Sequence, residues 1–169
     1  MATRSSISIQ TSKTGGKTIY CHWDGYPSNN GKLLKKHYNT EAKVLKLIAL
    51  GNLSILGKTI GKQVAFDGFD SRANPQCLAY ARERGETEQE ASSFRGKPKD
   101  TQEYDYLFKG GEWYVSQYNG KYVLLTDEII KANEMPNGYK DDYTPKPVKK
   151  AVKKATAVKQ VRAKVGKIN

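Results

Sequence analysis

Residues 104–125 read YDYLFKGGEWYVSQYNGKYVLL, and this stretch decides the fold class of the chain. Its aromatic and β-branched residues form three short runs, a composition typical of β-strands. Gly110-Gly111 and Asn119-Gly120 separate the runs, and such pairs favour tight hairpin turns because they accept positive φ angles. We therefore predict three consecutive antiparallel strands, over residues 104–109, 112–118 and 121–125.

A second hairpin is predicted near the amino terminus. Residues 5–10 alternate serine with isoleucine, the period of two that indicates a half-buried strand. Residues 18–23 supply the return strand, and the glycines of residues 14–17 are expected to form the turn through positive φ angles. Two further short strands are predicted over residues 63–66 and 76–81.

Helical patterns lie between these strands and after the last one. Residues 32–38 and 40–50 are predicted helices; Thr40 is a suitable N-cap for the second, and Gly51 a suitable glycine at its end. A last short helix is predicted over residues 126–134. Loops or irregular turns are predicted over residues 24–31, 53–56 and 83–98. The whole pattern predicts an α+β fold, an antiparallel sheet with helices packed on one face.

The net charge of +12 belongs mostly to the carboxyl-terminal segment. Residues 144–169 hold nine lysines and arginines and no acidic residue, which leaves the first 143 residues with a net charge of only +3. This division predicts a compact domain over residues 1–135 and a proline-containing hinge over residues 136–147. Residues 148–169, rich in lysine, alanine and valine, are predicted to be a disordered tail.

Composition and spacing exclude several classes of protein. No apolar run reaches the roughly 20 residues of a membrane helix, and residues 1–6 lack the apolar core of a secretory signal. Cys21 and Cys77 are therefore expected to be free thiols in a reducing compartment. No metal-ligand spacing is present, so neither a metal nor a cofactor is predicted. Gly16-Lys17-Thr18 and Gly57-Lys58-Thr59 resemble parts of a phosphate-binding loop, but the first glycine of that motif is missing from both.

The most unusual stretch is Tyr20-Cys21-His22-Trp23-Asp24-Gly25-Tyr26-Pro27. Neighbouring residues of a strand point to opposite faces, so His22 is poorly placed to activate the Cys21 thiol as a nucleophile. In one interpretation, Cys21 and Trp23 fill the core and Asp24-Gly25 makes a turn. In the other, the stretch contacts a ligand by stacking and hydrogen bonding.

A second cluster, residues 80–86, contains two arginines on either side of Glu83. The arginines could clamp a phosphate, or they could form local ion pairs in a solvated turn. No catalytic residue is predicted. The binding interpretation gives the candidate ligand-binding residues His22, Trp23, Asp24, Tyr26, Arg82 and Arg84.

The tail carries the clearest functional signal. Lysine side chains neutralise phosphates and release counterions, an attraction that does not depend on base sequence and weakens with salt. Segments of this kind resemble the lysine-rich tails of histone-like, DNA-condensing proteins. The predicted nucleic-acid-binding residues are Lys146, Lys149, Lys150, Lys153, Lys154, Lys159, Arg162, Lys164 and Lys167.

Residues 3–118 also carry a set of short motifs, with the stretch around Trp23 the most specific of them. The others are Thr3-Arg4-Ser5, Asn30-Gly31, His37-Tyr38, Leu50-Gly51, Ser54, Leu56-Gly57, Ala79-Tyr80, Arg82, Arg84-Gly85-Glu86, Tyr106-Leu107-Phe108 and Trp113-Tyr114. Together they resemble a family of small bacteriophage and prophage accessory proteins. The resemblance implies a host-takeover or anti-defence factor that binds a host protein, a nucleic acid or a nucleotide.

Three functions remain open at this point. The first is a non-enzymatic phage accessory protein whose body binds a partner and whose tail contacts DNA or RNA without sequence preference. The second is a body that holds a nucleotide or another small anion, and the third is a virion or DNA-packaging component. The expected location is the host cytoplasm close to the nucleoid, or the virion, and no membrane contact is expected.

Overall fold

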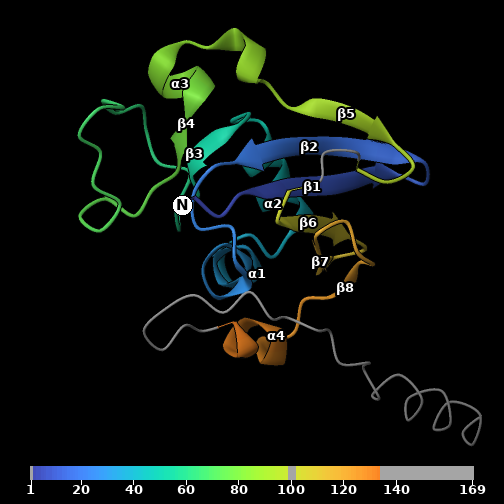
Figure 1. The fold of residues 1–169 in the computed structure, drawn as a ribbon. Helices are drawn as coiled ribbons and strands as arrows, with labels where there is room; N and C mark the ends of the chain where they lie inside the picture. The colour runs from blue at the N-terminus through green and yellow to red at the C-terminus, as the bar shows by residue number, and fades with distance from the viewer. Residues whose placement is uncertain (1, 99–101, 134–169) are drawn as a thin grey trace, which may run out of the picture.

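The computed structural model describes residues 2–98 and 102–133, and these residues form a sheet with helices against it (Figure 1). The strands are β1 Ser5–Ser12, β2 Gly15–Cys21, β3 Leu53–Ile55, β4 Leu78–Ala79, β5 Ser92–Arg95, β6 Tyr104–Lys109, β7 Glu112–Gln117 and β8 Val123–Leu124. The helices are α1 Lys32–His37, α2 Glu41–Ile48, α3 Tyr80–Arg84 and α4 Asp127–Ala132, with single turns η1 Pro27–Gly31 and η2 Thr87–Gln89. The predicted α+β class is confirmed. The predicted hinge, residues 136–147, and the tail, residues 148–169, lie outside the described residues.

The sheet is mixed, where the sequence predicted antiparallel pairing throughout. Its strand order is β4-β3-β2-β1-β6-β7-β8, and β5 pairs with β2 as well. β2 and β3 run parallel, as do β1 and β6. The helices α1 and α2 lie between β2 and β3 in the chain, and a crossover of that length returns a strand in the same direction. The predicted hairpins β1–β2 and β6–β7 are antiparallel, as expected.

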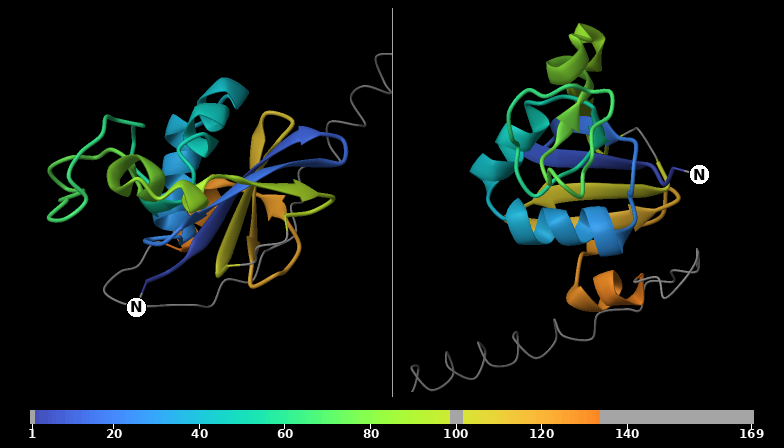
Figure 2. Two further views of the ribbon diagram at one scale, coloured as in Figure 1. Left: turned by 90° about the horizontal axis from the view of Figure 1, so that it is seen from above. Right: turned by 90° about the vertical axis from the view of Figure 1, so that its left-hand side faces the viewer.

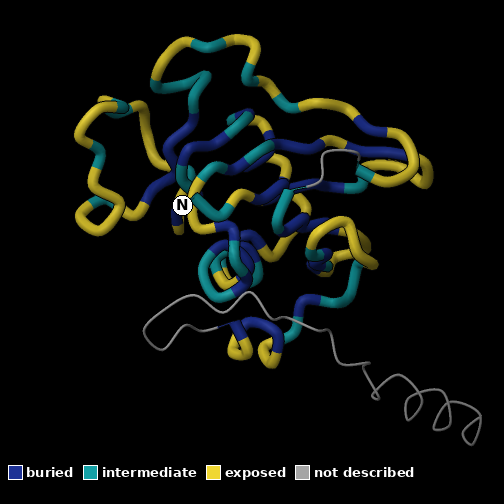
Figure 3. Tube along the Cα trace, viewed as in Figure 1, coloured by how far each residue is buried: buried dark blue, intermediate teal, exposed yellow. Residues whose placement is uncertain are grey.

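The main core lies between the sheet and the first two helices. Ile7 and Ile9 of β1 are fully buried and belong to one cluster with Val44 and Leu47 of α2 and Leu34 of α1. Figure 2 shows α2 against one side of the sheet with α1 beside it. Figure 3 shows that buried residues are concentrated along the strands of this sheet. The alternation of serine and isoleucine in β1 thus places isoleucine towards the helices, but the predicted half-buried strand is wrong, because Ser5, Ser6 and Ser8 are buried as well.

The opposite side of the central strands is polar but also buried. Ser6 Oγ donates a hydrogen bond to Asp105 Oδ1 at 2.6 Å, and Ser8 Oγ donates one to Thr18 Oγ1 at 2.8 Å. All four residues are 3% exposed or less. Hydrogen bonds between short polar side chains of neighbouring strands thus satisfy these buried groups.

The two glycines of the first hairpin serve a purpose that the sequence did not reveal. The turn lies at residues 13 and 14, and Gly15 and Gly16 already belong to β2. A Cβ on Gly16 would lie 1.9 Å from the Ile9 carbonyl oxygen, and one on Gly15 would lie 2.4 Å from that of Phe94. Close approach of neighbouring strands, and not a positive φ angle, therefore requires glycine here.

Several other predicted elements differ in the structure. Residues 53–55 form β3 in place of an irregular turn, and residues 63–66 form no strand. The predicted strand 76–81 becomes β4 followed at once by α3. Within the expected surface loop 83–98, β5 pairs with β2. These strands are two to four residues long and depend on partners far along the chain, which local sequence patterns do not encode.

The caps of the helices agree with the sequence. Thr40 accepts a hydrogen bond from the backbone of Lys43, and Thr126 accepts one from Ile129. Gly51 has a φ angle of 75°, the left-handed conformation expected after α2. Both N-cap threonines accept a hydrogen bond from a backbone amide in the first turn of their helix. The predicted positions of α2 and α4 are confirmed within a few residues.

Candidate binding site at the end of strand β2

The segment that follows β2 is held in one conformation by buried hydrogen bonds. Asp24 has a φ angle of 55°, which residues with a side chain seldom adopt. The amide of the fully buried Asn30 donates to the carbonyl of Trp23 at 3.3 Å, and the Tyr106 hydroxyl donates to the carbonyl of Gly25 at 2.7 Å. These bonds fix the backbone on both sides of Asp24, so the side chains of this segment are presented on a firm support.

Gly25 belongs to the same support. A Cβ at this position would lie 2.8 Å from the carbonyl carbon of Arg4, and the Gly25 amide donates to the carbonyl of Thr3 at 2.8 Å. The chain at the start of β1 thus passes directly against the turn. One of the two sequence interpretations predicted a turn at Asp24-Gly25; the structure has a left-handed backbone at Asp24 and bends at Trp23 and Tyr26.

Three aromatic rings follow one another along the end of β2. The Tyr20 hydroxyl and His22 Nδ1 share a hydrogen bond of 2.8 Å. The His22 ring meets the Trp23 ring edge to face, with 4.9 Å between centroids. The indole of Trp23 is 44% exposed, whereas that of Trp113 is only 4% exposed. The core interpretation is therefore right for the buried Cys21 and wrong for Trp23.

The position of Trp23 follows from where the strand ends. Cys21 is the last residue of β2 and lies in the core, so the same alternation would point Trp23 inward as well. At Trp23 the chain turns away, although its amide still donates to the Ser54 carbonyl at 3.1 Å. A large apolar ring on a fixed backbone is left facing solvent.

A pocket of about 160 Å³ opens beside Asp24, the residue that follows Trp23. Asp24, Asn29, Leu33 of α1, Lys58 and Gln76 are among the residues that line it. Its lining therefore includes an acidic and a basic residue. Polar residues that can donate or accept hydrogen bonds lie here one position along the chain from the exposed Trp23.

Tyr26 completes the segment that the sequence singled out. It is half-buried, and burial raises the pKa of its phenol above the ordinary value, with the neighbouring Asp24 carboxylate acting in the same direction. The phenol is thus protonated at neutral pH and can serve as a hydrogen-bond donor. Burial likewise raises the pKa of Tyr20, against the opposing effect of Arg4.

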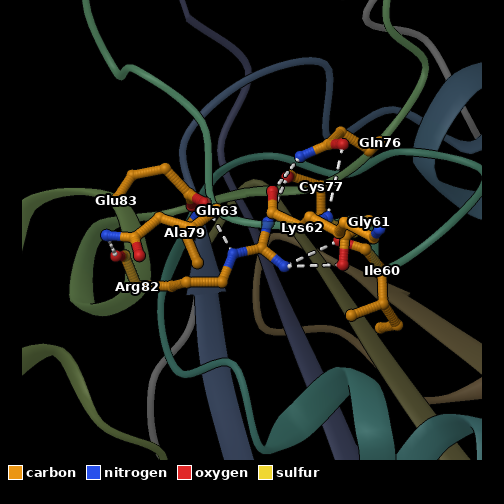
Figure 4. A network of polar contacts seen from close by, with 9 residues as sticks. All are labelled: Ile60, Gly61, Lys62, Gln63, Gln76, Cys77, Ala79, Arg82 and Glu83. Carbon is orange, nitrogen blue, oxygen red and sulfur yellow. Dashed lines mark hydrogen bonds and ion pairs between the residues drawn. The ribbon is translucent and has the colours of Figure 1, made fainter.

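The side chain of Arg82 bonds with other groups of the same chain (Figure 4). Its guanidinium donates to the carbonyls of Ile60 at 2.9 Å and Cys77 at 2.8 Å, and it pairs with the Glu83 carboxylate at 2.5 Å. The side chain of Glu83 has no exposed surface. Arg82 therefore fastens the long connection between β3 and β4, and its donors are taken by this chain.

Arg84 is also occupied locally. Its Nε lies 2.8 Å from Glu86 Oε1, and its guanidinium lies over the Phe66 ring at 4.9 Å from the centroid. Both arginines form local ion pairs, as one of the two sequence interpretations predicted, but the predicted solvated turn is wrong, because residues 80–84 form α3 and the Glu83 side chain is buried. The candidate site consequently rests on His22, Trp23, Asp24 and Tyr26, and the two arginines stabilise the connection beside β4.

The two cysteines are buried thiols. Burial raises the pKa of Cys21 to about 12, because the charged thiolate would lose its hydration. Burial also raises the pKa of Cys77, which lies 3.4 Å from the Tyr38 hydroxyl. Free thiols were predicted, and both cysteines are free. Neither sulfur is in the ionised form that a nucleophile requires.

Within residues 2–98 and 102–133, no group of three or more histidine, cysteine or acidic side chains is placed to hold a metal ion. No helix in the same part of the chain has the length and apolar character to cross a membrane.

The sequence analysis did not single out the lysines of residues 25–66. Residues 25–66 contain seven lysines and a single acidic residue, Glu41. Lys58 lines the pocket, while Lys36 and Lys43 lie near the imidazole of His37 closely enough to affect its charge. A charge count over shorter segments would have found this bias, which the small net charge of the first 143 residues conceals.

Comparisons with protein-family models, with curated proteins and with solved structures find no match to this chain. The resemblance of residues 3–118 to phage accessory proteins therefore stays a prediction.

Proposed function

We propose that this protein is a non-enzymatic binding protein for single-stranded nucleic acid. In this proposal, Trp23 stacks on an unpaired base, and the lysine-rich residues 144–169 supply attraction to the phosphates. The observation that carries the proposal is the 44% exposure of Trp23 on a backbone fixed by Asn30 and Tyr106. Stacking on an exposed aromatic ring requires an unpaired base, because bases in a duplex are already stacked.

The residues around Trp23 suit the edge of a base as well as its face. The carboxylate of Asp24 can accept hydrogen bonds from base amino groups, and the phenol of Tyr26 interacts with this carboxylate. Burial of Cys21 supports a binding role over a nucleophilic one, since it favours the neutral thiol. The nine cations of residues 144–169 would raise the local concentration of the strand near Trp23.

The first test is a substitution of Trp23 by alanine in the full chain. Loss of stacking is worth about 1–3 kcal/mol per base, so affinity for oligothymidylate should fall by roughly fivefold to 150-fold. Trp23→Phe keeps an aromatic face and should retain most of the affinity. Because the indole is exposed, the free energy of unfolding should change by about 0.5 kcal/mol or less.

The intrinsic fluorescence of the protein gives a direct readout. Trp23 and Trp113 are its two tryptophans, and the buried Trp113 should keep its emission when a strand binds. Quenching by oligothymidylate should disappear in Trp23→Ala. Equal affinity of the wild-type protein and Trp23→Ala would refute a contact between Trp23 and the strand, and would leave a protein partner as the occupant of this surface.

The second test removes residues 144–169. These residues carry nine cations, and each phosphate contact on a single strand contributes about 0.7 to the salt dependence of binding. The shortened chain should bind more weakly at low salt, and its affinity should vary much less with salt concentration. An unchanged salt dependence would contradict a role for the tail in nucleic-acid binding.

A further inference from the structure

Three of the seven lysines of residues 25–66 lie around His37 at one corner of the body. Lys36 lies in the last turn of α1, Lys43 lies in the first turn of α2, and Lys58 follows β3. All three are exposed. All three are close enough to His37 for their positive charges to lower the pKa of its imidazole.

The corner is rigid, because its parts are joined by buried hydrogen bonds. The Tyr38 hydroxyl donates to the carbonyl of Gly57 at 2.7 Å, which ties the end of α1 to the residue before Lys58. The indole of Trp113 donates to the Tyr38 carbonyl at 2.8 Å. The lysine backbones therefore keep their relative positions while their ammonium groups reach into solvent.

Lys58 and Lys43 are each anchored further. The amide of Lys58 donates to the carbonyl of Pro75 at 2.8 Å, so this residue is fixed from the other side of the pocket. The ammonium group of Lys43 donates to Asn39 Oδ1 at 3.0 Å, which holds it over the turn between the two helices.

These lysines are not neutralised by the rest of the described chain. Its ion pairs join Lys35 to Asp127, Arg82 to Glu83 and Arg84 to Glu86. Lys36, Lys43 and Lys58 take part in none of these pairs. The like charges of the three lysines repel, and a bound anion would relieve this repulsion.

We propose that Lys36, Lys43 and Lys58, grouped around His37, bind phosphate groups of a nucleic-acid strand. This phosphate corner rests on the proposed function and deepens it, because it assigns backbone contacts to the body as well as to the tail. The pocket relates the two sites, because it is lined both by Asp24, the residue after Trp23, and by Lys58 of the corner. Leu33 also lines it and lies one helical turn before Lys36 and His37. A strand whose base stacks on Trp23 would thus pass its backbone over the corner.

The charge on the rest of the body supports this direction of binding. Residues 83–90 contain four glutamates and one arginine, and they lie around α3, which Figure 1 places away from α1. A polyanion is repelled by these glutamates and attracted to the lysines of α1 and α2.

The test replaces Lys36, Lys43 and Lys58 by glutamine in the full chain. Its matched control replaces Lys13, Lys97 and Lys109, which are equally exposed but lie at hairpin turns and after β5. Both variants lose the same net charge. Binding of labelled oligothymidylate is measured by anisotropy over a range of sodium chloride concentrations.

The corner variant should bind at least tenfold more weakly at low salt than the control. Its logarithmic salt slope should be smaller by about 2, the value for three phosphate contacts on a single strand. The control should stay within about twofold of the wild type, since its lysines make no phosphate contact. Equal weakening of both variants would overturn the corner, because only the net charge would then matter. An equally tight complex with duplex DNA would overturn the passage of the strand from the corner to Trp23.

The two histidines separate this proposal from the one for Trp23. His22 touches the Trp23 ring and His37 lies in the corner, and the chain has no other histidine. In NMR spectra, oligothymidylate should shift the ring signals of both. Inorganic pyrophosphate, which has no base, should shift those of His37 alone. A shift of His37 without His22 would refute the Trp23 contact and keep the corner, and a His37 ring that responds to neither probe would overturn it.

Discussion

Two groups of cations in this body have opposite fates. Arg82 and Arg84 beside β4 have their guanidinium groups engaged by carbonyls, carboxylates and aromatic rings of the same chain. Lys36, Lys43 and Lys58 have backbones fixed by the fold and ammonium groups without a carboxylate partner in the described residues. The sequence made both arginines candidate ligand-binding residues because they stand on either side of Glu83. The comparison teaches that a cation is available to a ligand only where the fold has not already satisfied it.

The largest effect that sharpens this comparison is expected at Arg82. Arg82→Ala would leave the Glu83 carboxylate buried without its cation and would release the connection between β3 and β4. Removing one partner of a buried pair costs about 3 kcal/mol, so the free energy of unfolding should fall by about that amount. Urea denaturation measures this loss. A loss below about 1 kcal/mol would mean that Arg82 does not hold this connection.

Arg84→Ala is the matched control within the same helix and should have a much smaller effect. Its side chain is 49% exposed, and exposed ion pairs contribute about 1 kcal/mol at most. Neither arginine variant, when folded, should weaken binding of oligothymidylate by more than about twofold. A selective loss of binding in either one would return the arginines to the ligand site and break the comparison.

The difference between the two groups also explains what the sequence could predict. Hairpins such as β6–β7 and caps such as Thr40 depend on residues close together in the chain, so local patterns identify them. The pairing of β5 with β2, and the bonds from Arg82 to the carbonyls of Ile60 and Cys77, join distant segments. No local pattern encodes such contacts, and the residues that make them are ordinary in composition.

The candidate site, like the fold, could be predicted from the sequence only in part. The stretch from Tyr20 to Pro27 is recognisable in sequence because its residue types are unusual together. Whether Trp23 is buried depends on where β2 ends relative to the helices, and strand alternation alone points it inward. The phosphate corner depends on a helix–helix turn meeting the end of β3, so its lysines are scattered in sequence and gathered only by the fold.

The smallest expected effect concerns the pH dependence of the corner. Burial lowers the pKa of His37 below its ordinary value of 6.5, and the charges of Lys36, Lys58 and Lys43 add to this. As the pH falls below about 6.5, the unfolded chain binds a proton before the folded chain does. The free energy of unfolding should therefore decrease until the folded imidazole is protonated in turn. His37→Gln should remove this part of the pH dependence, with His22→Gln as the control that keeps it.

A bound phosphate would reverse the balance at His37. Its negative charge favours the protonated imidazole, so binding of oligothymidylate near pH 6 should take up a proton and strengthen as the pH falls. Calorimetry in buffers of different ionisation enthalpy measures this uptake, and His37→Gln should abolish it. Proton uptake that persists in His37→Gln would place the titrating group elsewhere. The three lysines would then be solvated charges that, like Arg82, bind no ligand.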